Sequence, residues 1–155
     1  MDLKQLNILL ADDDIDDCLF LKMAVDDFPS PTQLTVVHDG EQLMELLAGE
    51  TNELPHILFL DLNMHRKNGF ECLSDIKASK KLQHLSVIMF STSFEQGVVN
   101  QLYENGAQYF IRKPSEFSQF KKIIQQTLIL IAQENTLSQP SKENFVLTNE
   151  KPLTT

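Results

Sequence analysis

The chain has 155 residues, of which 42% are hydrophobic and 23% are charged, a balance typical of one soluble globular domain. The formal net charge is −9, which argues against nucleic-acid binding, because nucleic-acid-binding proteins carry basic patches that neutralise phosphates. No apolar run reaches the roughly 20 residues that cross a bilayer, and the N-terminus lacks the features of a secretory signal. We therefore expect a cytoplasmic protein that binds neither membranes nor nucleic acid.

Short apolar segments alternate with stretches of helical spacing along the chain. The predicted strands are Leu6–Ala11, Leu34–His38, Ile57–Leu60, Val87–Phe90 and Tyr109–Arg112. The predicted helices are Ile15–Asp26, with Leu19 and Met23 at helical spacing, Glu41–Ala48, one from Asn68-Gly69 to about Ser79, Gln96–Glu104, and Glu116 to about Glu134. This alternation predicts an α/β fold with a doubly wound, five-stranded parallel sheet that helices cover on both faces.

The pattern ends at about residue 134. Residues 135–155 are rich in Ser, Gln, Pro, Asn, Thr and Lys and contain few apolar residues. We therefore expect one domain over residues 1–134 and a flexible tail over residues 135–155, which is too short to be an output domain.

Polar residues follow four of the five predicted strands. Asp12-Asp13 follows the first strand, Asp61 the third, Ser91 the fourth and Lys113 the fifth. In open α/β sheets, ligands bind beyond the carboxyl ends of the strands. The sequence therefore predicts a site at this edge of the sheet, although each of these residue types is common in turns when taken alone.

The acidic residues suggest a site for a hard divalent cation such as Mg²⁺, which prefers oxygen ligands and keeps several waters. Asp13 and Asp61 are candidate direct ligands, Asp12 a candidate ligand through water, and the Asn63 carbonyl a further candidate. The alternative is that the run Asp12–Asp14 only caps the first helix, a role open to Asp14 or Asp16.

Asp61 lies at the mouth of an apolar strand, where a carboxylate can act as a nucleophile and form an aspartyl phosphate. The alternative is an ordinary turn-forming Asp. Ser91 offers a hydroxyl group to a phosphoryl oxygen, and Lys113 offers a positive charge to the phosphoryl group. It is the conjunction of these residues at four strand ends that favours a phosphoryl site.

Four segments occur in the order and spacing of a known family: Ile8–Asp14, Leu58–Met64 with Gly69, Val87–Ser91, and Gly106-Ala107 followed by Phe110–Pro114. Over about residues 6–133 the chain resembles the receiver domains of bacterial two-component response regulators, of the stand-alone, CheY-like kind. The resemblance implies a (βα)5 flavodoxin-like fold. It also implies a signalling protein that catalyses only its own phosphorylation and dephosphorylation, rather than an enzyme.

The resemblance assigns roles to the site residues. It implies that Asp61 is the phosphoacceptor and that Asp13, Asp61 and the Asn63 carbonyl bind Mg²⁺ or Mn²⁺, with Asp12 as an outer ligand. A histidine kinase or a histidine phosphotransfer protein would donate the phosphoryl group, and the receiver would signal by binding another protein. An alternative is a phosphorelay intermediate, which passes the group on to a phosphotransfer histidine. A phosphohydrolase is disfavoured, because Asn63 stands where such an enzyme needs an acid.

The resemblance further implies that Lys113 binds the phosphoryl group, that Ser91 and Phe110 are switch residues, and that the Lys113–Pro114 bond is cis. Three residues depart from the commonest family pattern. His65 replaces a Pro in the loop after Asp61, Thr92 replaces a small residue next to Ser91, and Phe110 replaces a Tyr and so lacks its hydroxyl.

The last predicted helix has more apolar residues than one stripe requires. The main stripe consists of Phe117, Phe120, Ile124, Leu128 and Ile131, whereas Ile123 and Leu130 lie to one side of it. One hypothesis is that Ile123 and Leu130 form a homodimer or partner interface. The other is that they belong to a wide core face.

Overall fold

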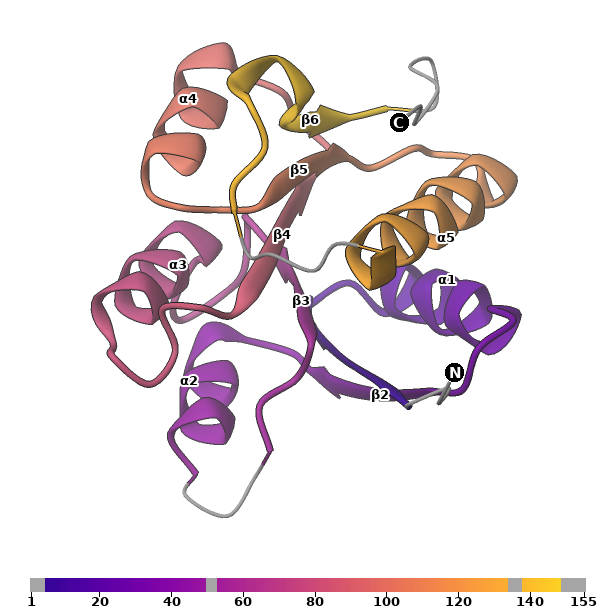
Figure 1. Cartoon of the computed structure of the whole chain (residues 1–155), viewed down its shortest axis with the longest axis horizontal. Helices are drawn as coiled ribbons and strands as arrows, with labels where there is room; N and C mark the ends of the chain where they lie inside the picture. The colour runs from indigo at the N-terminus through magenta and orange to yellow at the C-terminus, as the bar shows by residue number, and fades with distance from the viewer. Residues whose placement is uncertain (1–4, 50–52, 134–137, 149–155) are drawn as a thin grey trace.

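The computed structural model describes residues 5–49, 53–133 and 138–148, and within them strands and helices alternate (Figure 1). The strands are β1 (Leu6–Ala11), β2 (Thr32–Val37), β3 (Ile57–Asp61), β4 (Ser86–Ser91), β5 (Tyr109–Arg112) and the short β6 (Val146–Leu147). The helices are α1 (Ile15–Asp26), α2 (Gly40–Ala48), α3 (Gly69–Ala78), α4 (Gln96–Glu104), α5 (Phe117–Gln133) and a short 3₁₀ helix, η1 (Lys142–Asn144). The predicted elements are confirmed to within two residues at most ends.

All the strand pairs are parallel, and the sheet order is β2-β1-β3-β4-β5-β6. The chain first winds from β1 to the edge strand β2 and then crosses to β3 on the other side of β1. This reversal places a topological switch point at the carboxyl ends of β1 and β3, which is where ligands bind in such sheets. The predicted doubly wound parallel sheet is confirmed.

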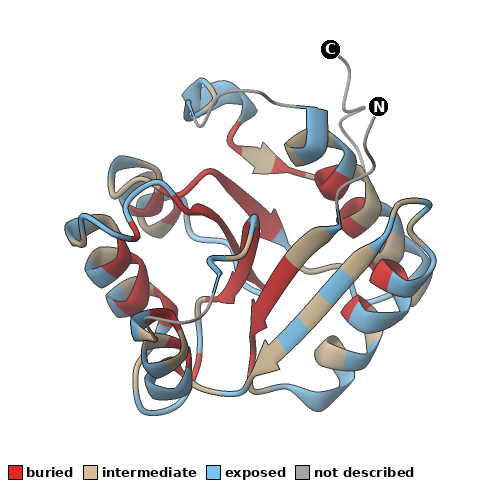
Figure 2. Ribbon diagram, turned by 60° about the horizontal axis from the view of Figure 1, so that its bottom comes forward, coloured by how far each residue is buried: buried red, intermediate tan, exposed pale blue. Residues whose placement is uncertain are grey.

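Helices cover both faces of the sheet. α1 and α5 pack side by side on one face, and α2, α3 and α4 lie on the other (Figure 1). Every residue of β3 and β4 is buried, and the helices turn buried faces towards the sheet while their outer faces are exposed (Figure 2). Two apolar clusters, one on each face, make up the core, and they hold the strand ends in fixed positions.

The sixth strand corrects the predicted tail. β6 pairs with β5 in the register Phe110↔Val146 and Ile111↔Leu147, and the side chains of Phe145 and Leu147 are buried. The folded unit therefore extends past the predicted boundary at residue 134, and the prediction of a flexible tail is wrong for residues 138–148. The polar composition of this segment hid two apolar side chains that cover an open sheet edge. The rest of the predicted tail, residues 135–137 and 149–155, lies outside the described residues.

The apolar residues noted at helical spacing in α1 do not form its inward face. Leu21, Ala24 and Val25 are buried, whereas Leu19 and Met23 are 53% and 50% exposed. The rotation of α1 about its own axis is set by packing against both the sheet and α5. The contact with α5 includes the rings of Phe20 and Phe117, whose centroids are 5.1 Å apart. Apolar spacing alone does not reveal this rotation.

The hypothesis of an interface through Ile123 and Leu130 is wrong. Ile123 is buried in the core cluster between α5 and the sheet, and Leu130 is half-buried against the same cluster. Because α5 packs against both the sheet and α1, its core face is wider than one stripe. The core interpretation of these two residues therefore holds.

Candidate functional site

The carboxyl ends of four strands bring the predicted polar residues together. Asp12 directly follows β1, whose Ala11 is paired with Leu60, so Asp12 lies beside Asp61 at the end of β3. In the same way, Asp61 is paired with Phe90, which places Ser91 one residue further on, and Ser91 is paired with Arg112, which places Lys113 next. The site predicted at this edge of the sheet is thus present.

Three carboxylates form an acidic metal site. Asp12, Asp13 and Asp61 each offer an oxygen atom, and these atoms lie within 4.8 Å of one another. Three negative charges at this spacing repel one another, and Asp12 and Asp61 are also buried. Oxygen ligands of this kind suit a hard divalent cation such as Mg²⁺ or Mn²⁺, which would neutralise the cluster. The Asn63 carbonyl as a further ligand remains a prediction.

Lys113 reaches the same cluster from β5. Its Nζ lies 2.7 Å from Asp17 Oδ2, 3.0 Å from Asp12 Oδ2 and 3.4 Å from Asp61 Oδ1, and its side chain is only 4% exposed. Burial opposes the ammonium, but the negative charges of Asp61 and Asp12 and the hydrogen bonds that Lys113 donates to Asp17 and Asp12 outweigh it and raise the pKa of Lys113. Lys113 is therefore a fixed positive charge at the edge of the carboxylate cluster.

Asp17 is a site residue that the sequence did not single out. It lies in the first turn of α1, and it makes the shortest of the three contacts of Lys113. The neighbouring Asp14 is the N-cap of α1, where its side chain accepts a hydrogen bond from the Asp17 backbone N–H at 3.1 Å. The acidic run thus serves both purposes considered for it, because it caps the helix and also supplies the site.

Burial raises the pKa of Asp61 to about 7, because desolvation outweighs the attraction of Lys113 and the negative charge of Asp12 adds to the rise. The ordinary value is 3.8. Between these two values the folded chain holds a proton that the unfolded chain releases. The free energy of unfolding therefore decreases as the pH rises through this interval.

We expect the metal-free protein to lose on the order of 4 kcal/mol of stability from this group between about pH 4 and pH 7. Urea unfolding of the wild type and of Asp61→Asn at pH 5 and pH 8 measures the loss. The wild type should weaken relative to the variant as the pH rises, and Mg²⁺ should restore stability at pH 8, since ligands that bind the folded state stabilise it. Parallel pH profiles for the two proteins would contradict this explanation.

The two predicted switch residues lie on neighbouring strands, Ser91 at the carboxyl end of β4 and Phe110 in β5, where it pairs with Met89. Ser91 is buried, and its Oγ accepts a hydrogen bond from Asn63 Nδ2 at 3.4 Å and another from the Ser93 backbone N–H at 3.2 Å. Phe110 is buried and packs edge-to-face against Phe94, with 6.0 Å between ring centroids. The hydroxyl of Ser91 is therefore tied both to the loop after Asp61 and to the loop after β4.

The loop after β3 is held close to Asp61 by a glycine. The backbone N–H of Gly69 donates to Leu62 O at 2.9 Å, and a Cβ atom at Gly69 would lie 2.3 Å from Asp61 O. Only glycine allows this approach. In the same loop, His65 Nδ1 lies 2.7 Å from Asp13 Oδ2, so the residue that departs from the commonest pattern contacts the metal site directly.

The sequence comparison decides the family. Residues 8–125 match the response regulator receiver domain family. The chain is a response regulator receiver. The response regulator Rcp1 of Synechocystis sp. is 26% identical over 122 residues, which cover 76% of this chain and 83% of Rcp1. The chemotaxis protein CheY of Listeria monocytogenes is 31% identical over 100 residues, which cover 64% of this chain and 82% of CheY.

Solved structures agree with this assignment. The phosphorylated cyanobacterial phytochrome response regulator RcpA superposes with a TM-score of 0.81 at 26% identity, over 86% of this chain and 98% of that one. The Mn²⁺-bound form of Rcp1 superposes with a TM-score of 0.78 at 26% identity, over 86% of this chain and 99% of that one. The receiver family consists of phosphoaccepting signalling proteins rather than enzymes.

One expectation taken from the family is wrong for this receiver. The structure has no cis peptide bond among the residues it describes, so the bond between Lys113 and Pro114 is trans. The position of Lys113 is nevertheless fixed, because its backbone N–H donates to Ser91 O at 2.8 Å and its ammonium lies 4.5 Å from the centroid of the Phe90 ring.

For Asp17, we expect Asp17→Asn to lower the free energy of unfolding by about 1–2 kcal/mol, because it weakens a part-buried, charge-assisted hydrogen bond to Lys113. Asp16→Asn is the matched control, since Asp16 directly precedes Asp17 and is exposed. This change should alter the free energy of unfolding by less than about 0.5 kcal/mol. Equal effects in urea unfolding would show that the contact between Asp17 and Lys113 contributes nothing specific.

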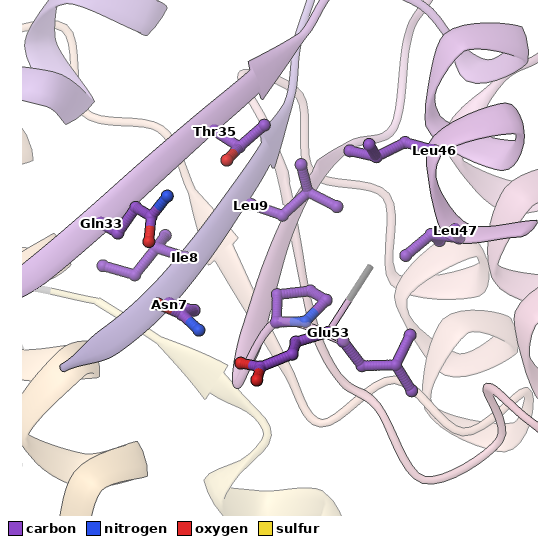
Figure 3. Close-up of a pocket in the computed structure, with 10 residues that line it drawn as sticks. Asn7, Ile8, Leu9, Gln33, Thr35, Leu46, Leu47 and Glu53 are labelled. Atoms are coloured by element: carbon purple, nitrogen blue, oxygen red, sulfur yellow. The ribbon is translucent and has the colours of Figure 1, made fainter. Parts of the chain in front are cut away.

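A separate cavity of about 250 Å³ lies at the opposite edge of the sheet, where β1 and β2 begin. Apolar side chains, including Leu9, Leu46 and Leu47, line it together with Asn7 and Glu53 (Figure 3). None of the predicted site residues lines this cavity. In the part of the chain that the structure describes, no helix is long and apolar enough to cross a membrane.

Proposed function

We propose that this receiver accepts a phosphoryl group on Asp61 from a histidine kinase or a histidine phosphotransfer protein, in a reaction that requires Mg²⁺. The negative charge it gains would act as a signal that is passed on by contact with another protein in the cytoplasm. The observation that carries this proposal is the convergence of Asp12, Asp13, Asp61 and Lys113 at one edge of the sheet.

The geometry suits phosphoryl transfer to a carboxylate. An oxygen atom of Asp61 attacks the phosphorus atom, an O–P bond forms, and the bond from phosphorus to the donor nitrogen breaks as the donor histidine leaves. A bound divalent cation would offset the charge of the carboxylates and of the incoming phosphoryl group. Asp12 and Asp13 would hold that cation, Lys113 would pair with a phosphoryl oxygen, and the Ser91 hydroxyl would donate to another.

Two structural relatives support the proposal. The solved structure of RcpA is of a phosphorylated protein, and that of Rcp1 is of a Mn²⁺-bound one. The likeness extends over 98% and 99% of those chains. The roles of the individual residues follow from the positions described above.

The outer face of α1 supports a protein partner close to the site. Ile15, Leu19 and Met23 follow one another at intervals of four residues and are 72%, 53% and 50% exposed, so they form one apolar stripe. The same helix carries Asp17, which binds Lys113. We therefore place the docking surface for the phosphoryl donor protein on this stripe.

For this surface, we expect Leu19→Glu to slow phosphoryl transfer from a donor protein by about 10-fold or more, because it places a charge within an apolar contact. Uptake from a small acyl phosphate should be unchanged, since that donor needs no docking surface. Leu54→Glu is the control, because Leu54 is an exposed leucine that lines the cavity at the opposite edge of the sheet. Equal slowing with both donors would contradict the assignment of the stripe.

The proposed function is tested by incubating the protein with a small acyl-phosphate donor and following its intact mass. We expect one phosphoryl group per chain in the presence of Mg²⁺, slower or no uptake with a chelator, and recovery with Mn²⁺. Equal uptake with and without the chelator would contradict a metal-dependent receiver, and no uptake under any of these conditions would contradict the proposal as a whole.

A further inference from the structure

Residues 138–148, which we call the strap, lie along the outer edge of β5 (Figure 1). Val146 and Leu147 pair with Phe110 and Ile111, and the backbone N–H of Phe110 donates to Phe145 O at 3.0 Å. The side chain of Phe145 is 1% exposed. The strap thus fills a position on the edge strand that an extended peptide of any origin would be able to occupy.

Side-chain donors bind main-chain carbonyl oxygens on both sides of the contact between the strap and the rest of the fold. Tyr103 Oη donates to Pro140 O at 2.8 Å, and Gln108 Nε2 donates to Ser138 O at 2.8 Å. Gln139 Nε2 donates to two main-chain carbonyl oxygens at the junction of α4 and β5, both at 2.6 Å. Backbone pairing combined with a few side-chain pockets is the way in which sheet edges bind peptides.

One aromatic side chain anchors the strap. The Phe145 ring packs edge-to-face against Tyr103, with 5.0 Å between centroids, and it belongs to the apolar cluster that contains Val99, Leu102 and Phe110. The residues just before it in η1 are exposed, and only two residue pairs join β6 to β5. A segment with so few buried contacts belongs to the part of a fold that opens most easily.

A chain of contacts joins the strap to the phosphoacceptor site. Ser93 hydrogen-bonds to Ser91 Oγ, and the next residue, Phe94, packs against Phe110. Phe110 in turn donates its backbone N–H to Phe145 O. A phosphoryl group on Asp61 would offer the Ser91 hydroxyl a stronger acceptor than Ser93 Oγ, which lies 3.2 Å from it. A rearrangement of the loop after β4 would then move Phe94 against Phe110 and so weaken the contacts of Phe110 with the strap.

We propose that the outer edge of β5, together with α4, is a docking groove for an extended segment of a partner protein that carries an aromatic side chain. The strap is the resident occupant of this groove, and its release on phosphorylation of Asp61 opens the groove to the partner. Only this release rests on the proposed function. The chemistry of the partner segment follows from the occupant already seated there, which supplies one buried aromatic ring and a strand that pairs with β5.

The tether explains why release is needed. A segment joined to its own groove by a short linker competes with an effective concentration on the order of millimolar. A partner segment at cellular concentration would not displace it unless the contacts of the strap were weakened. The strap would therefore prevent the unphosphorylated receiver from binding the partner segment.

The groove is tested on the full chain with a fluorescent peptide of the sequence of residues 138–148. Gln139→Ala loosens the strap without touching the core, because Gln139 is exposed and contributes the two hydrogen bonds to carbonyl oxygens. We expect the peptide to bind this variant about 10-fold more tightly than the wild type. A control peptide in which the residue equivalent to Phe145 is Ala should not bind.

Three outcomes would overturn the groove as a partner site. Failure of the peptide to bind either protein would show that no groove is present, and equal binding to both would show that the strap does not occupy it. A doubled mass of the variant in sedimentation, together with loss of peptide binding, would show that two copies exchange straps and that no partner segment is needed.

Release is tested by amide hydrogen exchange, for which the Phe110 N–H is a single-residue reporter. With Mg²⁺ and acyl phosphate, exchange at Phe110 and Leu147 should increase about 10-fold or more, while amides in β1 and β3 stay protected. Stoichiometric phosphorylation, seen by mass, with unchanged exchange would overturn the release of the strap. Failure to phosphorylate would overturn the proposed function, while the peptide experiment would still decide the groove.

Discussion

Asp61→Asn is expected to lower phosphoryl uptake from an acyl phosphate by at least about 100-fold, because the amide that replaces the carboxylate is not a nucleophile. The neighbouring Asp12 is a poor substitute, since its two oxygens already accept hydrogen bonds from the Asp14 N–H and from Lys113. Asn has almost the same shape as Asp, so the fold and the surrounding contacts should be retained. Intact mass against time measures the uptake.

Asp16→Asn is the control for this prediction, because it removes the same charge from an exposed residue at the start of α1. The control should take up phosphate at the rate of the wild type. Uptake by Asp61→Asn at the wild-type rate would show that another group is the nucleophile, and slow uptake by both variants would show that net charge rather than position controls the reaction.

Asp13→Asn is expected to weaken Mg²⁺ binding by about 10- to 100-fold, because a site with few direct carboxylates loses one of them. Asp14→Asn is its matched control. The side chain of Asp14 caps α1 by accepting from the Asp17 N–H, and Asn caps helices as well as Asp does. Calorimetric titration with Mg²⁺, repeated with Mn²⁺, should show a change of less than about 3-fold for Asp14→Asn.

Equal losses of affinity in Asp13→Asn and Asp14→Asn would mean that the acidic run has been assigned in the wrong register. The contact between His65 and Asp13 adds a second readout. Because His65 Nδ1 lies 2.7 Å from Asp13 Oδ2, a cation held by Asp13 would displace or reorient the ring. The NMR shifts of the His65 ring should therefore respond to Mg²⁺ in the wild type and not in Asp13→Asn.

Much of the site could be predicted from the sequence, because parallel strands all end at one edge. The last residue of each strand, or the one directly after it, must lie at that edge, which brings together Asp12, Asp61, Ser91 and Lys113. Strand ends follow from short apolar runs that stop at a polar residue. The register between neighbouring strands then fixes which side chains meet.

Asp17 could not be predicted in this way, because it lies on a helix and its contact depends on the rotation of that helix. The same rotation turned Leu19 and Met23 outwards and Leu21 and Val25 inwards. In α1, apolar residues occupy both the buried face and the outer stripe, so apolar spacing did not determine the phase. The packing of Phe20 against Phe117 of α5 depends on a residue almost one hundred positions away.

The strap cannot be predicted from composition, and the reason is different. Composition is averaged over a window, and the window around residue 145 is polar, whereas its fold depends on two side chains, those of Phe145 and Leu147. Their burial also requires the open edge of β5, which no local pattern reveals. A segment that folds onto a surface made elsewhere in the chain carries little signal of its own.

We expect the phosphoryl group to reside on the carboxylate of Asp61, and site mapping after phosphorylation tests this position. The protein is treated with acyl phosphate and Mg²⁺, reduced with borohydride, which converts an aspartyl phosphate to homoserine, and then digested and sequenced by mass spectrometry. We expect homoserine at position 61 and unmodified aspartate at positions 12 and 13. A phosphoryl group that resists borohydride and maps to His65, or homoserine at any position other than 61, would contradict phosphorylation of Asp61.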